Sequence, residues 1–308
     1  MIKHLFLIWG LLAALTAEPV LACTSAVVSG KVTPDGRPLL WKNRDTDYLR
    51  NHVAYIKGEK YNFIADVNSA NFPALKEAWM GTNSVGFALM NTQSYNLVEV
   101  KDGEERGAAN GRIIYRALEV CATVEDFCHF LDTISKPSDI EANFGVIDAQ
   151  GGAAIFEVDY YKYVMYDANN PKDAPYGYIA RTNFSFAGKV NEGAGYVRYM
   201  EADQVLMKAS ATGSITPQFI FNDLSRSFRN RMLDIDLRSG AYNRPQASGW
   251  FVDQDFIPRS STSCSVVVQG VKPGEKAELT TMWTLLGYPP TGIAVPLWVK
   301  DAGKLLPG

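Results

Sequence analysis

The feature that most constrains the fold is a helical segment, residues 111–135, set between strand-like runs. Its apolar residues recur at spacings of three and four, the period of helices that bury one face. Thr123 precedes Asp126 by three residues, as in a capping box, so a second helix should begin there. We therefore expect two consecutive helices in this segment, because the apolar period and the capping box are both local features of the sequence.

Strand-like runs surround this segment, and turn residues separate them into hairpins. Two further helical patterns follow, and strand patterns return at the C-terminal end. Because strands and helices come in alternating blocks, we expect an α+β fold built from layers of sheet and helix. The expected hairpins lie at 24–43, 52–67, 77–91 and 143–159, the later helices at 195–210 and 216–228, and the last strands from 263 onward.

Composition excludes several classes of protein. Of the 308 residues, 47% are apolar, which suffices for a large core and argues against disorder. The net charge is −3 and no Lys/Arg-rich run occurs, so we expect no nucleic acid partner. The four cysteines form no cluster with metal-ligand spacing, and we expect neither a metal nor a cofactor.

The first 22 residues have the three-part pattern of a secretory signal peptide. A basic start at Lys3 precedes an apolar run at 5–15, and Val20 and Ala22 stand at positions −3 and −1 before Cys23. The run is too short to cross a bilayer as a helix, and no other segment of the sequence is long and apolar enough. We therefore expect no integral membrane segment after cleavage. The sequence predicts a signal peptide at 1–22, a mature domain at 23–308, and export to the periplasm or the medium.

A mature chain that begins with cysteine carries a nucleophile and a base on one residue. A thiol attacks only as thiolate, and a neutral α-amine, with a reference pKa of about 7.7–8.0, can remove its proton. A carboxylate would orient that amine, and an arginine near the sulfur would favour thiolate. Arg44 and Asp47 follow Cys23 at the far end of its predicted hairpin, which would return them to its side.

Five motifs in order resemble the N-terminal-nucleophile (Ntn) hydrolases. After Cys23-Thr24 come "NRDTDY", "GTNSVGFALMN", "ARTNFS" and "YVRYMEAD". The chain resembles the choloylglycine hydrolase and penicillin V acylase superfamily, and most of all its acyl-CoA:6-aminopenicillanic acid acyltransferase-like branch. The resemblance implies a four-layer αββα sandwich and a cysteine amidohydrolase that cleaves small linear N-acyl amides, such as N-acyl amino acids, bile salt conjugates or penicillin V-like substrates.

The resemblance also implies the site residues. Cys23 would be nucleophile and base, with Asp47 binding its ammonium and Arg44 holding the thiolate. Asn91 would donate to the oxyanion, Asn183 would orient the cysteine end or line the oxyanion site, and Arg198 would support the charge network.

Departures from the family pattern leave alternatives open. Tyr48, Asn43, Phe184 and Ser185 replace the usual residues, so the substrate is not transferred. The interval from Asn183 to Arg198 lacks the insertion that helps to build the bile salt hydrolase tetramer, and the oligomeric state stays open. An acyltransferase of the same fold would pass the acyl group to an amine. "VLAC" is also close to a lipobox, and lipidation of Cys23 would leave a tethered, non-catalytic protein.

The first prediction concerns processing. N-terminal sequencing of exported protein should read Cys-Thr-Ser-Ala-Val, because the α-amine mechanism requires Cys23 to begin the mature chain. Intact mass provides the control, since lipidation would add hundreds of daltons. Residues retained before Cys23, or a blocked N-terminus, would contradict the mechanism.

Overall fold

The structure is a computed structural model that describes residues 22–99, 107, 109–242 and 253–305. The predicted signal peptide therefore lies outside the described residues, apart from Ala22. Within the described part of the chain, no helix has the length and apolar character needed to span a membrane.

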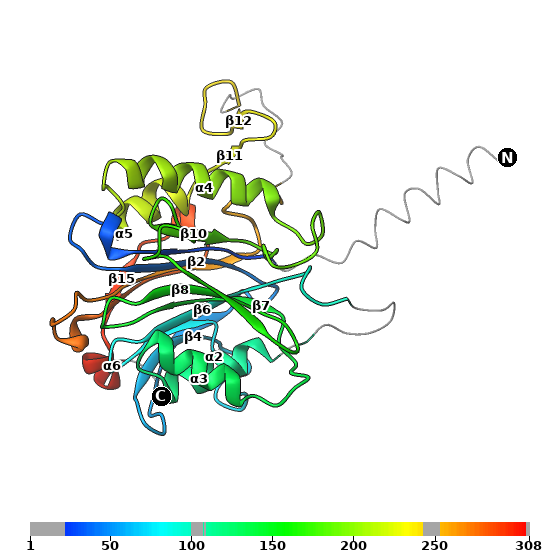
Figure 1. The fold of residues 1–308 in the computed structure, drawn as a ribbon. Coiled ribbons are helices and arrows are strands. Elements are labelled where there is room, and N and C mark those ends of the chain that lie inside the picture. Colours follow the sequence, from blue (N-terminus) through cyan, green and yellow to red (C-terminus); the bar gives the residue numbers. More distant parts are fainter. Residues whose placement is uncertain (1–21, 100–106, 108, 243–252, 306–308) are drawn as a thin grey trace.

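Two antiparallel sheets packed face to face form the centre of the molecule, and helices cover both outer faces (Figure 1). Helix α4 lies over the first sheet, and helices α2 and α3 lie over the second. Three buried apolar clusters fill the interfaces between these four layers. The predicted αββα sandwich is confirmed.

The first sheet has six strands in the order β10-β1-β2-β13-β14-β15. Its central strands β1 and β2 form the predicted hairpin, and β13 covers the other edge of β2. The strands are β1 (Thr24–Val28), β2 (Leu39–Asp45), β10 (Tyr178–Arg181), β13 (Thr262–Gln269), β14 (Thr281–Leu286) and β15 (Val295–Leu297).

The second sheet is a seven-stranded meander in which each strand pairs with the next along the chain. Its strands are β3 (Asn51–Ile56), β4 (Phe63–Asn68), β5 (Met80–Asn83), β6 (Ala88–Gln93), β7 (Ala142–Ile147), β8 (Ala153–Val158) and β9 (Tyr163–Asp167). A two-stranded ribbon, β11 (Arg229–Asn230) and β12 (Ile235–Asp236), lies apart from both sheets.

The helices follow the local sequence signals. The capping box is confirmed, because Thr123 accepts from the amide of Asp126 and Asp126 accepts from the amide of Thr123. The expected helix at 216–228 is shorter than its pattern suggested: it begins as α5 and continues in a single π turn. The helices are α2 (Asn110–Val120), α3 (Val124–Thr133), α4 (Tyr196–Ala211), α5 (Pro217–Phe219), the π turn η2 (Ile220–Leu224) and α6 (Val299–Leu305), with 3-10 turns η1 (Gly30–Val32), η3 (Ala277–Leu279) and η4 (Pro289–Thr291).

Gly145 on β7 lets the two sheets approach each other closely. A Cβ atom there would overlap Met90 Cε and would lie 2.9 Å from both Leu40 Cδ1 and Val27 Cγ2. Leu40 and Val27 belong to the first sheet, so their side chains fill the space that a side chain at position 145 would need. The glycine is needed for intersheet distance and not for an unusual backbone angle, since its φ is not positive.

We predict that Gly145→Ala lowers the free energy of unfolding by about 1–3 kcal/mol, because overpacking a closed core forces neighbours out of their rotamers. Urea unfolding measures the change. Gly240→Ala is the matched control, since no atom of the described residues lies within 4 Å of the position that its Cβ would take. Equal stability of the two variants would contradict this account of the intersheet contact.

Candidate active site

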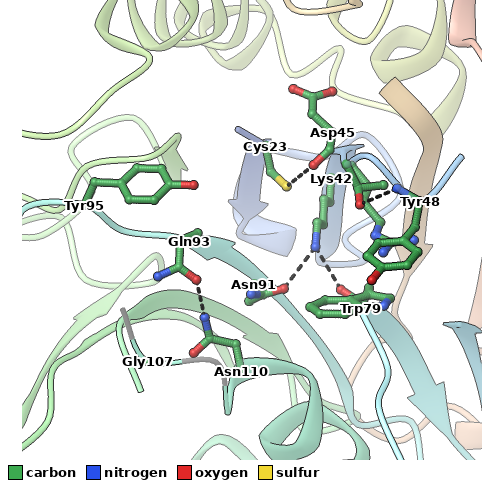
Figure 2. A pocket seen from close by; sticks show the side chains of 12 residues that line it. Cys23, Lys42, Asp45, Tyr48, Trp79, Asn91, Gln93, Tyr95, Gly107 and Asn110 are labelled. Atoms are coloured by element: carbon green, nitrogen blue, oxygen red, sulfur yellow. Dashed lines mark hydrogen bonds between the residues drawn. The ribbon is translucent and has the colours of Figure 1, made fainter. Parts of the chain in front are cut away.

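A cavity of about 310 Å³ opens where the start of β1 and the end of β2 face strand β6 of the second sheet. Figure 2 shows Cys23 and Lys42 reaching into it from the first sheet, with Asn91 and Trp79 opposite. The lining residues are Cys23, Lys42, Arg44, Asp45, Thr46, Tyr48, Trp79, Asn91, Gln93, Tyr95, Gly107 and Asn110.

Cys23 sits immediately before β1, with its thiol in the cavity wall. The residue is 9% exposed, and its Sγ lies 3.9 Å from the main-chain oxygen of Asp45. The other three cysteines line no part of this cavity, and burial raises the pKa of Cys121 to about 12. Cys23 is thus the thiol that a bound small molecule would meet.

Arg198 on α4 donates a hydrogen bond to the main chain of Cys23. One guanidinium nitrogen donates to the Cys23 carbonyl at 2.7 Å and to Thr24 Oγ1 at 2.8 Å, and the other donates to Asn183 Oδ1 at 3.0 Å. Asn183 Nδ2 in turn donates to the Gln93 carbonyl at 2.8 Å. Burial, and then the charge of Arg259, lower the pKa of Arg198 to about 10. Asn183 stands outside the cavity lining, which favours orientation of the cysteine end over a place in the oxyanion site.

Asp45, at the end of β2, is the buried carboxylate of the site. Its Oδ2 accepts from Arg259 Nε at 3.1 Å and Nη2 at 2.7 Å, and its Oδ1 accepts from Thr262 Oγ1 at 2.5 Å. Arg259 Nη2 also donates to the Ala22 carbonyl at 2.7 Å, next to the predicted cleavage point. Burial raises the pKa of Asp45, while Arg259 and then Arg198 oppose that rise.

The assignment of Asp47 as the site carboxylate is corrected to Asp45. Asp47 is exposed beyond the end of β2 and lines no part of the cavity. Asp45 still pairs with Thr262 of β13, so it is the last side chain that the sheet holds in place.

Arg44 lies where it was expected, in the cavity wall, but its charge is already paired. Its guanidinium donates to Asp66 Oδ2 at 3.2 Å and to Asn68 Oδ1 at 2.6 Å, and it stacks 4.8 Å from the centre of the Trp79 ring. Both partners of the guanidinium belong to β4 of the second sheet. Arg44 therefore links the two sheets beside the cavity, and the cavity wall contains a second cation.

That cation is Lys42, which sequence reasoning missed. Its Nζ donates to Asn91 Oδ1 and to the Trp79 carbonyl, both at 3.0 Å, and the residue is 2% exposed. Lys42 and Asp45 have the same three-residue spacing as Arg44 and Asp47. The available signal was strand alternation: Lys42 pairs with Ser25, and residues two apart, such as Cys23 and Ser25, share a face.

Comparisons with known proteins agree with this fold. Residues 32–210 match the family model described as "Acyl-coenzyme A:6-aminopenicillanic acid acyl-transferase". A variant of conjugated bile acid hydrolase from Clostridium perfringens is 14% identical, with 93% of this chain and 94% of that chain covered and a TM-score of 0.50. At this identity the likeness shows the fold alone.

Two further solved structures are similar at lower TM-scores. Penicillin V acylase from Agrobacterium tumefaciens is 15% identical over 86% of this chain and 82% of that chain, with a TM-score of 0.46. An ortholog of N-acylethanolamine-hydrolyzing acid amidase from Caenorhabditis elegans is 15% identical over 66% of this chain and 89% of that chain, with a TM-score of 0.47. No curated protein sequence matches significantly.

We predict that Asp45→Asn lowers the free energy of unfolding by about 3 kcal/mol, because it leaves the buried guanidinium of Arg259 without its counter-charge. Asp47→Asn is the matched control and should change it by less than about 0.5 kcal/mol, as for other exposed positions. Urea unfolding of both variants at pH 7 measures the difference. A larger loss for the Asp47 variant would contradict the placement of the buried carboxylate.

Proposed function

The chain belongs to the acyl-coenzyme A:6-aminopenicillanic acid acyl-transferase family, and from this premise we propose that it is an exported hydrolase of small linear N-acyl amides with Cys23 as its N-terminal nucleophile. The observation that carries the proposal is the hold on Cys23 itself. Arg198 binds its carbonyl, Arg259 binds the carbonyl just before it, and Asp45 is bound to Arg259. These contacts hold Cys23 in position at the cavity, which supports it as the first residue of the mature chain.

The α-amine of Cys23 is the base in this mechanism. Cleavage after Ala22 removes the carbonyl that Arg259 holds and frees the amine at the same place, close to Arg259 and to the Asp45 carboxylate. The neutral amine takes the thiol proton, and Sγ bonds to the amide carbonyl carbon while the carbonyl electron pair moves to oxygen. Collapse of this intermediate breaks the C–N bond, and the leaving amine takes the proton from the α-ammonium.

Water then cleaves the thioester by the same route in reverse. The α-amine removes a proton from the attacking water, the oxyanion forms again, and the Cys23 thiolate leaves and recovers its proton from the ammonium. The products are a free carboxylic acid and the starting enzyme. If an amine enters in place of water, the same thioester gives acyl transfer, which is the second candidate that the family membership supports.

Asn91 on β6 is the proposed oxyanion donor. Lys42 donates to its Oδ1, so its amide nitrogen is the end left to face the cavity that Asn91 lines. Among the described residues, Nδ2 makes no hydrogen bond, whereas Oδ1 accepts from Lys42. One donor of this kind contributes about 2.7–4 kcal/mol to transition-state binding.

The cavity suits an apolar acyl group of modest size. Tyr48, Trp79 and Tyr95 contribute aromatic surface to its wall, and its volume of about 310 Å³ is at the lower end of small-molecule sites. N-acyl amino acids, penicillin V-like amides and bile salt conjugates are the substrates to compare.

The experiment is a substrate panel with detection of the acyl-enzyme. Mature protein is incubated with N-acyl amino acids, penicillin V, bile salt conjugates and N-acyl homoserine lactones, with and without an amine acceptor. We expect hydrolysis of at least one amide and a thioester on the peptide that begins at Cys23, seen by mass. Product formed only with the acceptor would favour acyl transfer.

Variants of two cysteines serve as controls. Cys23→Ala should abolish turnover and the thioester while the protein stays folded. Cys128→Ala, in the half-buried position on α3, should retain turnover and change mainly stability. Correctly processed protein that forms no acyl-enzyme with any of these amides would refute the proposed function.

A further inference from the structure

Lys42 is a buried lysine that crosses from one sheet to the other at the cavity. It stands on β2, and its Nζ donates to Asn91 Oδ1 on β6 and to the Trp79 carbonyl just before β5 (Figure 2). Both acceptors are neutral oxygens. Among the described residues, no carboxylate forms a salt bridge with this ammonium, so its positive charge can act on a group bound in the cavity.

The charged and titratable groups that face Lys42 come from four strands. They are Cys23 at the start of β1, Arg44 on β2, Asp66 on β4 and Cys264 on β13. Asp66 already pairs with Arg44 at 3.2 Å and lies 3.7 Å from the Cys264 thiol. Of these groups, Cys23 and Arg44 line the cavity together with Lys42, and the charge of Arg44 is already paired with Asp66.

An ammonium at this position gives the Asn91 amide a single orientation. An ammonium has only donors, so the Asn91 oxygen must face it and the amide nitrogen must face away. A neutral amine has a lone pair and can also accept from Asn91 Nδ2, which would remove that constraint. Loss of the Lys42 proton would also remove a positive charge from the cavity wall that Lys42 and Cys23 share.

We propose that Lys42 is a positioning residue that works only while protonated: it aims the Asn91 amide at the oxyanion and supplies positive charge to the cavity wall that it shares with Cys23, so that turnover falls when Lys42 loses its proton. This inference rests on the proposed function of Cys23 and Asn91. Burial lowers the pKa of Lys42 and Arg44 adds to that effect, while Cys23, Cys264 and Asp66 oppose it. An arginine at the same place would stay charged throughout the accessible pH range.

The experiment compares Lys42→Met and Lys42→Arg over pH 6–10, with kcat and KM measured on whichever amide the wild type hydrolyses. Lys42→Met should lower kcat by about 100-fold, the effect of losing one oxyanion donor, with little change in KM. In wild type, kcat should fall at alkaline pH. Lys42→Arg should keep most of kcat and move that fall upward by about one pH unit or more.

Lys31→Met is the matched control, because Lys31 is exposed and its Nζ contacts only the Asn169 carbonyl far from the cavity. It should behave as wild type in every assay. An alkaline fall at the same pH in wild type and Lys42→Arg would overturn the proposal, as would a Lys42→Met enzyme with wild-type kcat. If Lys42→Met does not fold, the Lys42→Arg profile alone decides.

A second readout separates this inference from the proposed function. The rate of alkylation of Cys23 by iodoacetamide, followed by mass on its N-terminal peptide, requires no substrate. Lys42→Met should slow it roughly threefold at neutral pH, because the variant removes the positive charge that Lys42 supplies to the cavity wall beside Cys23. Unchanged alkylation would overturn the role of Lys42 even if amides are hydrolysed, whereas slowed alkylation without any turnover would refute the proposed function alone.

Discussion

The buried ion pair of Asp45 with Arg259 is the interaction on which the site depends. A carboxylate and a guanidinium taken out of water must satisfy each other, and here Thr262 and the Ala22 carbonyl complete the set of hydrogen bonds. The pair therefore joins two distant parts of the chain, the end of β2 and the start of β13, and Arg259 also holds the carbonyl of Ala22, which the proposed cleavage would remove. Removal of either charge would leave the other buried and release both parts.

Strand β2 presents different chemistry on its two faces. Lys42 and Arg44 point toward the second sheet, where they bind Asn91 and Asp66. Asn43 points the other way and exchanges hydrogen bonds with Ser225 beneath the helical layer. This alternation places two cations in the cavity wall and leaves the opposite face for packing, so the strand is both a structural centre and a source of charge.

The helical layer also contributes to the site, through Arg198. Helix α4 packs on the first sheet by apolar contacts, which carry its first turn to the start of β1. From there Arg198 reaches the main chain of Cys23 and, through Asn183, the end of β6. Cys23 is thus held by Arg198 of the helical layer and linked to the second sheet through Asn183, so its position relative to Asn91 follows from the packing of the layers.

Much of the fold was predictable from local sequence. The capping box at Thr123, the helical period that follows it and the hairpin turns depend on residues close together in the chain, and the structure confirms them. The order of motifs also indicated the family and selected Cys23, Asn91 and Arg44, which line one cavity in the structure. The helix and hairpin signals were sufficient because each depends on residues only a few positions apart in the sequence.

The sequence by itself determined the helices, the hairpins and the family, whereas the tertiary structure decided which polar residues form the site. The stretch from Lys42 to Asp47 offers two cation–carboxylate pairs with the same spacing, and local sequence cannot separate them. Pairing with β13 ends strand β2 at Asp45, Asp66 pairs with the charge of Arg44, and Lys42 reaches across the cavity to Asn91. Each of these choices depends on a partner more than twenty residues away in the sequence, because charge pairing and burial are set by packing and not by neighbours along the chain.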